Sequence, residues 1–139
     1  MGYSKKTNTA LWMAQWMVGL FFIVASGAPK LLLPPEMLPM PIPLPAAFIT
    51  FIGVSEVLGG LGLILPGLFH IRTGLTPLAG LGLVVVTASA TVYNLAAGVP
   101  GSAVFAASLG LIVAAIAYGR WRLAPLASSS PRPALGAAK

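Results

Sequence analysis

The sequence predicts an all-α membrane protein, a bundle of four transmembrane helices with both termini on the cytoplasmic side. Composition is the first reason. Only 7% of the 139 residues are charged and 58% are hydrophobic, whereas a soluble domain carries about 25% charged residues. Such a chain has too little polar surface to stay in water as a folded domain. It is not expected to be disordered either, because disordered chains are poor in apolar residues. The main partner we expect is therefore a lipid bilayer.

Long stretches without charge are the second reason, because a membrane-spanning helix needs about 20 apolar residues. Residues 7–29 fit one span, residues 46–66 fit another with a single charge, and residues 73–119 fit two. We expect spans at about 8–28, 46–65, 78–97 and 102–118, within one membrane domain of residues 1–122. Residues 123–139 are expected to form a flexible cytoplasmic tail. Pro29 directly after Ala28 disfavours cleavage as a signal peptide, so the first span should be retained.

The basic residues predict the orientation, because short cytoplasmic loops are rich in Lys and Arg. With the N-terminus inside, only Lys30 of the basic residues lies outside. The cytoplasmic ones are then Lys5, Lys6, Arg72, Arg120, Arg122, Arg132 and Lys139. They lie at the ends of spans and form no continuous stripe. The net charge of +6 therefore indicates contact with the membrane surface and not with nucleic acid.

The 13 prolines all flank or lie outside the expected spans. We interpret each as a helix boundary, because proline interrupts helical hydrogen bonding. Residues 39–45 alternate proline with apolar residues and should run extended. We expect the segment Leu31–Pro45 to lie along the outer interface or to fold over the outer mouth of the bundle. Recognition of this segment by a proline-binding partner domain is the alternative.

Glu56 is the acidic residue inside a predicted span. It lies roughly 15 Å from the start of that span at about 1.5 Å per residue, near the middle of a hydrocarbon core of about 30 Å. An unpaired charge there is costly. Lys30 could reach it by snorkelling, provided that tilt or an inward dip of the chain closes a depth gap of about 10 Å. Uncharged groups could form a polar pocket instead, and without a cation burial favours the protonated carboxyl. The candidates for that pocket are Gln15, Thr87, Thr91 and Asn94.

Two roles of Glu56 stay open. As a functional group it would accept a proton or orient a ligand in a small intramembrane pocket, with Lys30 as its possible partner. As a structural group it would hydrogen-bond two helices together. In either role it shares a helix face with glycines, and small residues let membrane helices approach closely. The glycines expected at helix contacts are Gly53, Gly59, Gly60, Gly62 and Gly110.

Few residues of this chain carry chemistry. It has no cysteine and one histidine, so the sequence predicts no metal site and no catalytic residue. His70 and Arg72 lie in the loop between the second and third spans. They could bind a quinone headgroup or a lipid phosphate, or they could simply be solvated. We therefore expect no cofactor held by the chain itself, with quinone as the open case, and no enzymatic activity of the chain alone.

Two stretches together resemble the DoxX-like family of small four-helix membrane proteins. Ser26-Gly27-Ala28-Pro29-Lys30-Leu31 resembles the family's Ser-Gly-x-x-Lys-Leu, and Gly53 to Leu63 resembles its Gly-x-x-Glu-x-x-Gly-x-x-Gly-Leu. The resemblance covers roughly residues 8–122 and implies a bacterial cytoplasmic membrane protein. Some relatives are subunits or partners of membrane oxidoreductases, including thiosulfate:quinone chemistry, and others act in assembly or have no assigned role. Relatives that handle thiols need cysteines, which this chain lacks.

Three functions are open on the sequence. We expect a non-catalytic subunit or accessory factor of a quinone-linked redox system. Such a protein would associate with membrane oxidoreductase subunits. A small proton-coupled transporter would need several buried polar groups and broken helices, of which the sequence shows mainly Glu56. A structural or assembly protein, alone or as a homo-oligomer, would need only stable helix packing.

Overall fold

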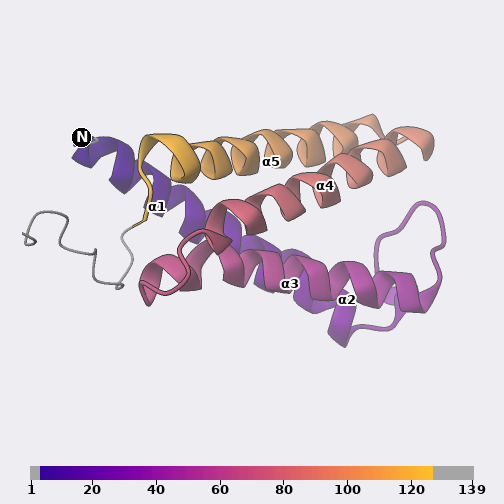
Figure 1. Cartoon of the computed structure of the whole chain (residues 1–139). Coiled ribbons are helices and arrows are strands. Elements are labelled where there is room, and N and C mark those ends of the chain that lie inside the picture. Colours follow the sequence, from indigo (N-terminus) through magenta and orange to yellow (C-terminus); the bar gives the residue numbers. More distant parts are fainter. Residues whose placement is uncertain (1–3, 127–139) are drawn as a thin grey trace, which may run out of the picture.

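The computed structural model describes residues 4–126, and the elements in this range are all helical (Figure 1). The first long helix runs without a break through α1 (Lys5–Leu20), the π-helix η1 (Phe21–Gly27) and α2 (Ala28–Leu32). The other elements are the short 3-10 helix η2 (Pro35–Met37), then α3 (Ala46–Leu68), α4 (Leu75–Ala96), α5 (Pro100–Tyr118) and the π-helix η3 (Gly119–Leu123). Four helices are long and apolar enough to cross a membrane, which confirms the predicted all-α, four-helix fold.

The first helix continues through Pro29, so the interpretation of every proline as a helix boundary is wrong here. In an α-helix, a proline clashes with the carbonyl four residues earlier and leaves it without a donor. The helix before Pro29 is π-helical instead, and the N–H of Ala28 bonds the carbonyl of Ile23, five residues back. This wider turn accommodates the proline. The helix ends at Leu32 because Leu33, which precedes Pro34, is extended.

Other prolines also lie inside helices. Pro66 is within α3, two residues before its end, where the loss of one backbone bond is tolerated. Pro77 lies in the first turn of α4 and Pro100 is the first residue of α5. At these positions a backbone N–H would have no helical partner in any case. As a result α4 begins at Leu75, earlier than the expected residue 78.

The helices pack largely in chain order. α3 lies between the first helix and α4, and α4 packs along α5 (Figure 1). The bundle closes where α5 meets the first helix, with the rings of Phe21 and Phe105 5.8 Å apart. The buried core consists of Val18, Phe22, Leu63, Ile64, Leu83, Val113 and Ile116. Many other large apolar side chains point outward, Leu111 with 74% of its surface exposed, as expected for helices surrounded by lipid.

Glycines set the distances between neighbouring helices. The first helix and α3 meet at two reciprocal pairs, Gly19 with Gly60 and Gly27 with Gly53. A Cβ added to Gly60 would lie 2.6 Å from the carbonyl oxygen of Gly19, and one added to Gly27 would lie 3.0 Å from that of Gly53. The backbones therefore touch at two places about two turns apart. Such close approach is available only to very small residues.

Other glycines fit the remaining helices together. Gly59 faces Leu83 and Gly62 faces Ala79, so a second face of α3 packs on α4. Gly110 of α5 meets the hydroxyl of Thr87. The structure thus places each of the five glycines singled out from the sequence at a contact between helices.

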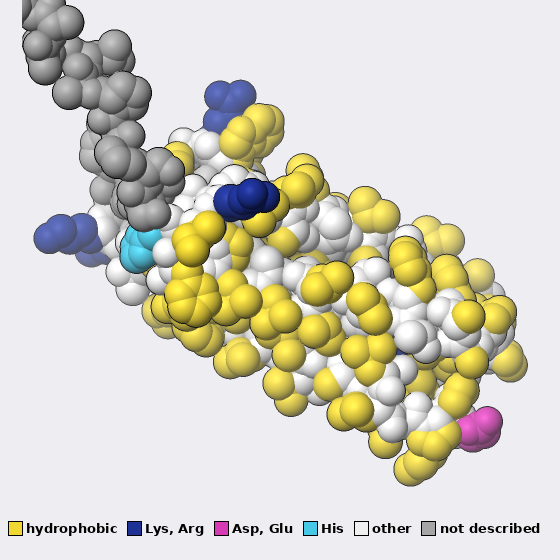
Figure 2. Space-filling view, turned by 60° about the horizontal axis from the view of Figure 1, so that its bottom comes forward, with side chains coloured by type: hydrophobic (Ala, Val, Ile, Leu, Met, Phe, Trp, Pro, Cys, Tyr) yellow, Lys and Arg dark blue, Asp and Glu magenta, His cyan; other side chains and the backbone are white. Residues whose placement is uncertain are grey.

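Charges gather at the two ends of the bundle. One end, here called the basic end, is formed by the start of α1, the loop between α3 and α4, and η3. It carries Lys5, Lys6, Arg72 and Arg122, all exposed, and the buried Arg120. Figure 2 shows Lys and Arg side chains at the end that carries the histidine, with an acidic side chain at the opposite end. Between the two ends, the face seen in Figure 2 carries many apolar side chains, and large apolar side chains are exposed on every long helix.

The proline-rich segment connects α2 to α3 at the end opposite the basic end. Residues 38–45 are non-helical, whereas Leu31 and Leu32 still belong to α2. The segment is attached to α4 through one side chain. The hydroxyl of Tyr93 accepts a hydrogen bond from the N–H of Ile42 at 2.9 Å and donates one to the Ile42 carbonyl. Tyr93 therefore takes the place of the backbone partner that this proline-rich segment lacks.

The first residues of the expected flexible tail, residues 123–139, pack against the bundle. Leu123 ends η3, and Ala124 is completely buried. Leu126 lies against Gly67 near the end of α3. The rest of the expected tail, residues 127–139, lies outside the described residues.

The Gly60 contact predicts a large effect of a single methyl group. Gly60→Ala would force α3 away from the backbone of Gly19, and overpacking of this kind destabilises by about 1–3 kcal/mol. We expect a lower melting temperature of the full-length protein in mild detergent. Gly82→Ala is the matched control, since a Cβ there has no atom within 4 Å. Equal melting temperatures for the two variants would contradict the packing described here.

Candidate functional site

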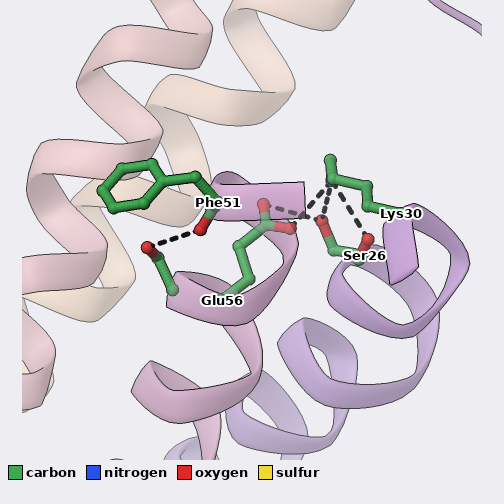
Figure 3. Close-up of polar contacts among 5 residues, drawn as sticks. Ser26, Lys30, Phe51 and Glu56 are labelled. Atoms are coloured by element: carbon green, nitrogen blue, oxygen red, sulfur yellow. Dashed lines mark hydrogen bonds and ion pairs between the residues drawn. The ribbon is translucent and has the colours of Figure 1, made fainter. Parts of the chain in front are cut away.

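Three polar side chains form a compact cluster between the first helix and α3 (Figure 3). The ammonium of Lys30 lies 2.8 Å from Oε2 of Glu56, forming an ion pair. The hydroxyl of Ser26 donates to Oε1 of the same carboxylate at 3.0 Å. Lys30 also donates to the hydroxyl and to the carbonyl of Ser26, both at 3.0 Å. Lys30 is thus the partner of Glu56, and Ser26 is a second partner that the sequence analysis did not single out as one.

The glycine contacts bring these side chains together. Glu56 lies between Gly53 and Gly60 on the face of α3 that touches the first helix, and Ser26 directly precedes Gly27. A Cβ on Gly53 would lie 3.0 Å from the Cβ of Lys30, so the lysine is level with a residue one turn from Glu56. Because the first helix ends beside the interior of α3, near Gly53, and not beside the first residues of α3, the expected depth gap between Lys30 and Glu56 is closed.

The hydrogen-bonding capacity of the cluster is largely used. An ammonium has three donors, and Lys30 makes three hydrogen bonds. Both oxygens of Glu56 accept a hydrogen bond, and its side chain is only 7% exposed. The lysine side chain is 25% exposed, so its stem reaches the surface of the bundle while its charge is neutralised inside. The arrangement joins the first helix to α3 through an ion pair and a shared hydroxyl group.

The polar pocket considered around Glu56 is not assembled by hydrogen bonds to that carboxylate. Thr87, Thr91 and Asn94 each donate to a carbonyl of their own helix, α4. Gln15 is completely buried, but its amide donates to the carbonyl of Leu63 on α3, about two turns from Glu56. These four residues therefore stabilise local helix structure or a different helix contact.

A second polar cluster, which the sequence analysis missed, lies near the basic end. Arg120 is 2% exposed, although its position after the last span indicates a cytoplasmic loop. Its guanidinium donates to the side-chain oxygens of Gln15 and Asn8 and to the carbonyl of Ala124. It also lies 5.2 Å from the centre of the Trp12 ring. Through these contacts Arg120 joins η3 to α1 and, by way of Gln15, to α3.

His70 and Arg72 lie in the exposed loop after α3, where both have positive φ angles of 56° and 46°. His70 follows the last helical residues in the left-handed conformation that glycine usually takes at helix ends. The N–H of Ile71 then bonds the carbonyl of Pro66 at 3.0 Å, which completes this helix end. His70 thus has a structural position, and neither residue lines either of two apolar grooves on the surface formed by residues 4–126.

Simple signals could have found part of what was missed. Ser26 is four residues before Lys30, so both lie on one helix face, and a serine there can bridge the lysine to a partner. Arg120 gives no comparable signal, because its burial depends on Asn8 and Gln15, more than 100 residues earlier. Within residues 4–126, no group of three or more His, Cys, Asp or Glu side chains is arranged to hold a metal ion.

A bundle of four apolar helices with a lysine–glutamate pair between the first and second spans defines a small multi-pass membrane protein. The model of the DoxX-like family matches residues 13–117. The chain therefore belongs to this family, as its two motifs indicated. Comparison with curated proteins and with solved structures gives no match.

Removing Lys30 and removing Glu56 should lower the stability of the protein by unequal amounts. Lys30→Met leaves a carboxylate buried without its cation, and a buried pair broken in this way costs about 3–5 kcal/mol. Glu56→Gln should cost less, because the unpaired lysine can turn its charge toward the surface. The double variant, Lys30→Met with Glu56→Gln, should recover most of the stability lost in Lys30→Met.

Thermal or denaturant unfolding of the full-length protein in lipid would measure these differences. Lys6→Met, which removes an exposed cation on α1, serves as the control and should have little effect. Additive losses in the double variant would contradict a direct interaction between the two side chains.

Proposed function

We propose that this chain is a non-catalytic subunit or accessory factor of a quinone-linked redox system in the membrane. The observation that carries the proposal is the closed cluster of Ser26, Lys30 and Glu56. Its charges neutralise each other within the bundle, so it acts as a joint between helices. The redox part of the proposal comes from the resemblance to a family in which some members are associated with membrane oxidoreductases.

The inventory of reactive groups supports a non-catalytic role. The whole chain has two acidic residues, one histidine and no cysteine. Of the acidic residues, Glu56 is paired with Lys30, and Glu36 is exposed in η2. A proton-coupled transporter needs a buried group that exchanges protons with both sides, whereas the carboxylate of Glu56 is already occupied. The same observation favours a purely structural or assembly role as the second candidate.

Quinone belongs to the partner system in this proposal. A quinone headgroup offers two carbonyl oxygens that need hydrogen-bond donors. His70 and Arg72, the loop residues considered for this purpose, line neither of two apolar surface grooves, which are bordered mostly by aliphatic side chains together with Tyr118 and Trp121. We therefore assign the quinone site to an associated oxidoreductase.

We also propose that the basic end faces the cytoplasm and that the protein lies in the cytoplasmic membrane of a bacterium, following the bias of Lys and Arg. A reporter that is active only outside the cytoplasm should give no signal when fused after Lys139. The same reporter inserted between Met37 and Leu38, in the connection between α2 and α3, should give a strong signal. The reverse pattern would contradict the orientation.

The redox role predicts a partner and a loss of activity. The tagged full-length chain, extracted in mild detergent, should co-purify with subunits of an oxidoreductase identified by mass spectrometry. Membranes from cells that lack this chain should reduce a soluble quinone analogue at least about tenfold more slowly with that oxidoreductase's own electron donor. The reason is that the partner loses the helices that hold it in place.

Two complementing variants separate the candidates. The double variant Lys30→Met with Glu56→Gln should restore quinone reduction if it accumulates to wild-type levels, because the proposal gives the pair no protonic role. Unchanged quinone reduction in cells lacking the chain would overturn the redox role and leave the assembly role. Loss of activity in a double variant that still binds the oxidoreductase would show that the Lys30–Glu56 pair has a role beyond joining helices and would contradict the proposal.

A further inference from the structure

A long apolar groove runs between α4 and α5 and opens on the outside of the bundle. Its volume is about 510 Å³, within the range of roughly 300–1,000 Å³ typical of small-molecule sites. Leu78, Leu81 and Val84 of α4 form one wall, and Ala114, Tyr118 and Trp121 lie on the other side. The small side chain of Ala114 leaves space between the two helices. In a bilayer this groove faces the hydrocarbon.

The groove extends from the basic end into the membrane over a defined depth. Its lining on α4 begins at Gly74, the residue before the helix, and ends at Val84. Ten residues of helix are roughly 15 Å long, which is half the thickness of a hydrocarbon core of about 30 Å. The groove therefore has the length of one leaflet.

Positive charge lies at the mouth of this groove. Trp121 lines it, and the guanidinium of Arg122 lies 4.7 Å from the centre of the Trp121 ring. Within residues 4–126, the only contact found for the guanidinium of Arg122 is the one with the Trp121 ring, and no hydrogen bond or ion pair to it is seen. The two acidic residues of the chain are elsewhere, Glu36 at the opposite end and Glu56 between the first helix and α3. The stacked arrangement holds the arginine where lipid headgroups begin.

We propose that the groove binds an anionic phospholipid from the leaflet at the basic end. One acyl chain lies between α4 and α5, along Leu78 to Val84, and the phosphate accepts hydrogen bonds from Arg122. Charge selects the headgroup, because Arg122 faces no competing carboxylate, and the apolar walls accept any acyl chain of sufficient length. This site is separate from the Lys30–Glu56 cluster and does not depend on the redox role.

Other occupants fit the groove less well. A quinone would find hydrogen-bond donors near the basic end of the groove, at Tyr118 and Trp121, but it carries no charge for Arg122. A helix from a second copy would bring an apolar face into the groove but no negative charge for the arginine beside Trp121. An anionic lipid satisfies both the apolar walls and the arginine.

Native mass spectrometry of the full-length protein tests the proposal. The probes are phosphatidylglycerol and phosphatidylcholine with identical acyl chains, titrated separately into protein in mild detergent. The wild type should retain phosphatidylglycerol in preference to phosphatidylcholine. Arg122→Gln, a change at an exposed residue, should weaken phosphatidylglycerol binding about fivefold, as expected for one interfacial cation, and leave phosphatidylcholine unchanged.

Matched variants separate this site from general attraction to the basic end. Lys6→Gln removes an exposed cation of the same end on α1 and should not change the binding of either lipid. Ala114→Leu fills the groove and should weaken both lipids, whereas Ala107→Leu, at an exposed position on α5 outside the groove, should not. Melting temperatures of all four variants would exclude unfolding as the cause.

Several results would overturn the proposal. Equal binding of the two lipids by the wild type would show that charge does not select the headgroup. Equal effects of Arg122→Gln and Lys6→Gln would show that the lipid is not bound at Arg122. A dimer or a co-purified quinone that is lost in Ala114→Leu but kept in Arg122→Gln would show that the groove has a different occupant.

Discussion

The close approach of the first helix to α3 is the constraint on which the rest of the structure depends. Reciprocal glycine contacts let the two backbones touch, and between them the carboxylate of Glu56 meets Lys30 and Ser26. A charge in this position is tolerated in lipid only when a partner neutralises it. The first helix must therefore end early enough to put Lys30 beside Gly53. The proline-rich segment, held by Tyr93, covers the remaining distance to the start of α3.

The first helix contacts the rest of the bundle through polar side chains towards both of its ends and through apolar side chains in its middle. Near the basic end, Gln15 bonds the carbonyl of Leu63 and receives the guanidinium of Arg120. Towards the other end lies the cluster of Lys30 and Glu56. In lipid, hydrophobic burial does not drive helices together, so specific polar joints and tight glycine contacts have to define their register. The supporting role that we propose rests on this commitment of Glu56 and Arg120 to contacts between the helices of the chain itself.

Much of the fold could be predicted from the sequence, because lipid imposes strong rules on composition. Three stretches without charge, and one whose single charge is Glu56, located the four helices. Gly53, Glu56 and Gly60 share a face by simple helical spacing. Helix ends were less predictable, since proline at residue 29 is compatible with a π-helical turn that local preference does not indicate. The partners of Glu56 were left open because the depth of a residue in the membrane depends on where its helix begins and ends. Those helix ends could not be read from the sequence with enough precision to place Lys30 beside Glu56. Arg120 could not have been placed, since its burial depends on residues of α1 brought near by the complete fold.

The ionisation of Glu56 within the bilayer tests this account most directly. The infrared spectrum of the full-length protein in lipid at neutral pH would be recorded for the wild type and for Glu56→Gln, and the difference between them isolates this side chain. An ion pair with Lys30 predicts that the band lost in the variant is the carboxylate stretch. Loss of the carbonyl stretch of a protonated carboxyl would show that Glu56 is neutral and that the lysine does not neutralise it.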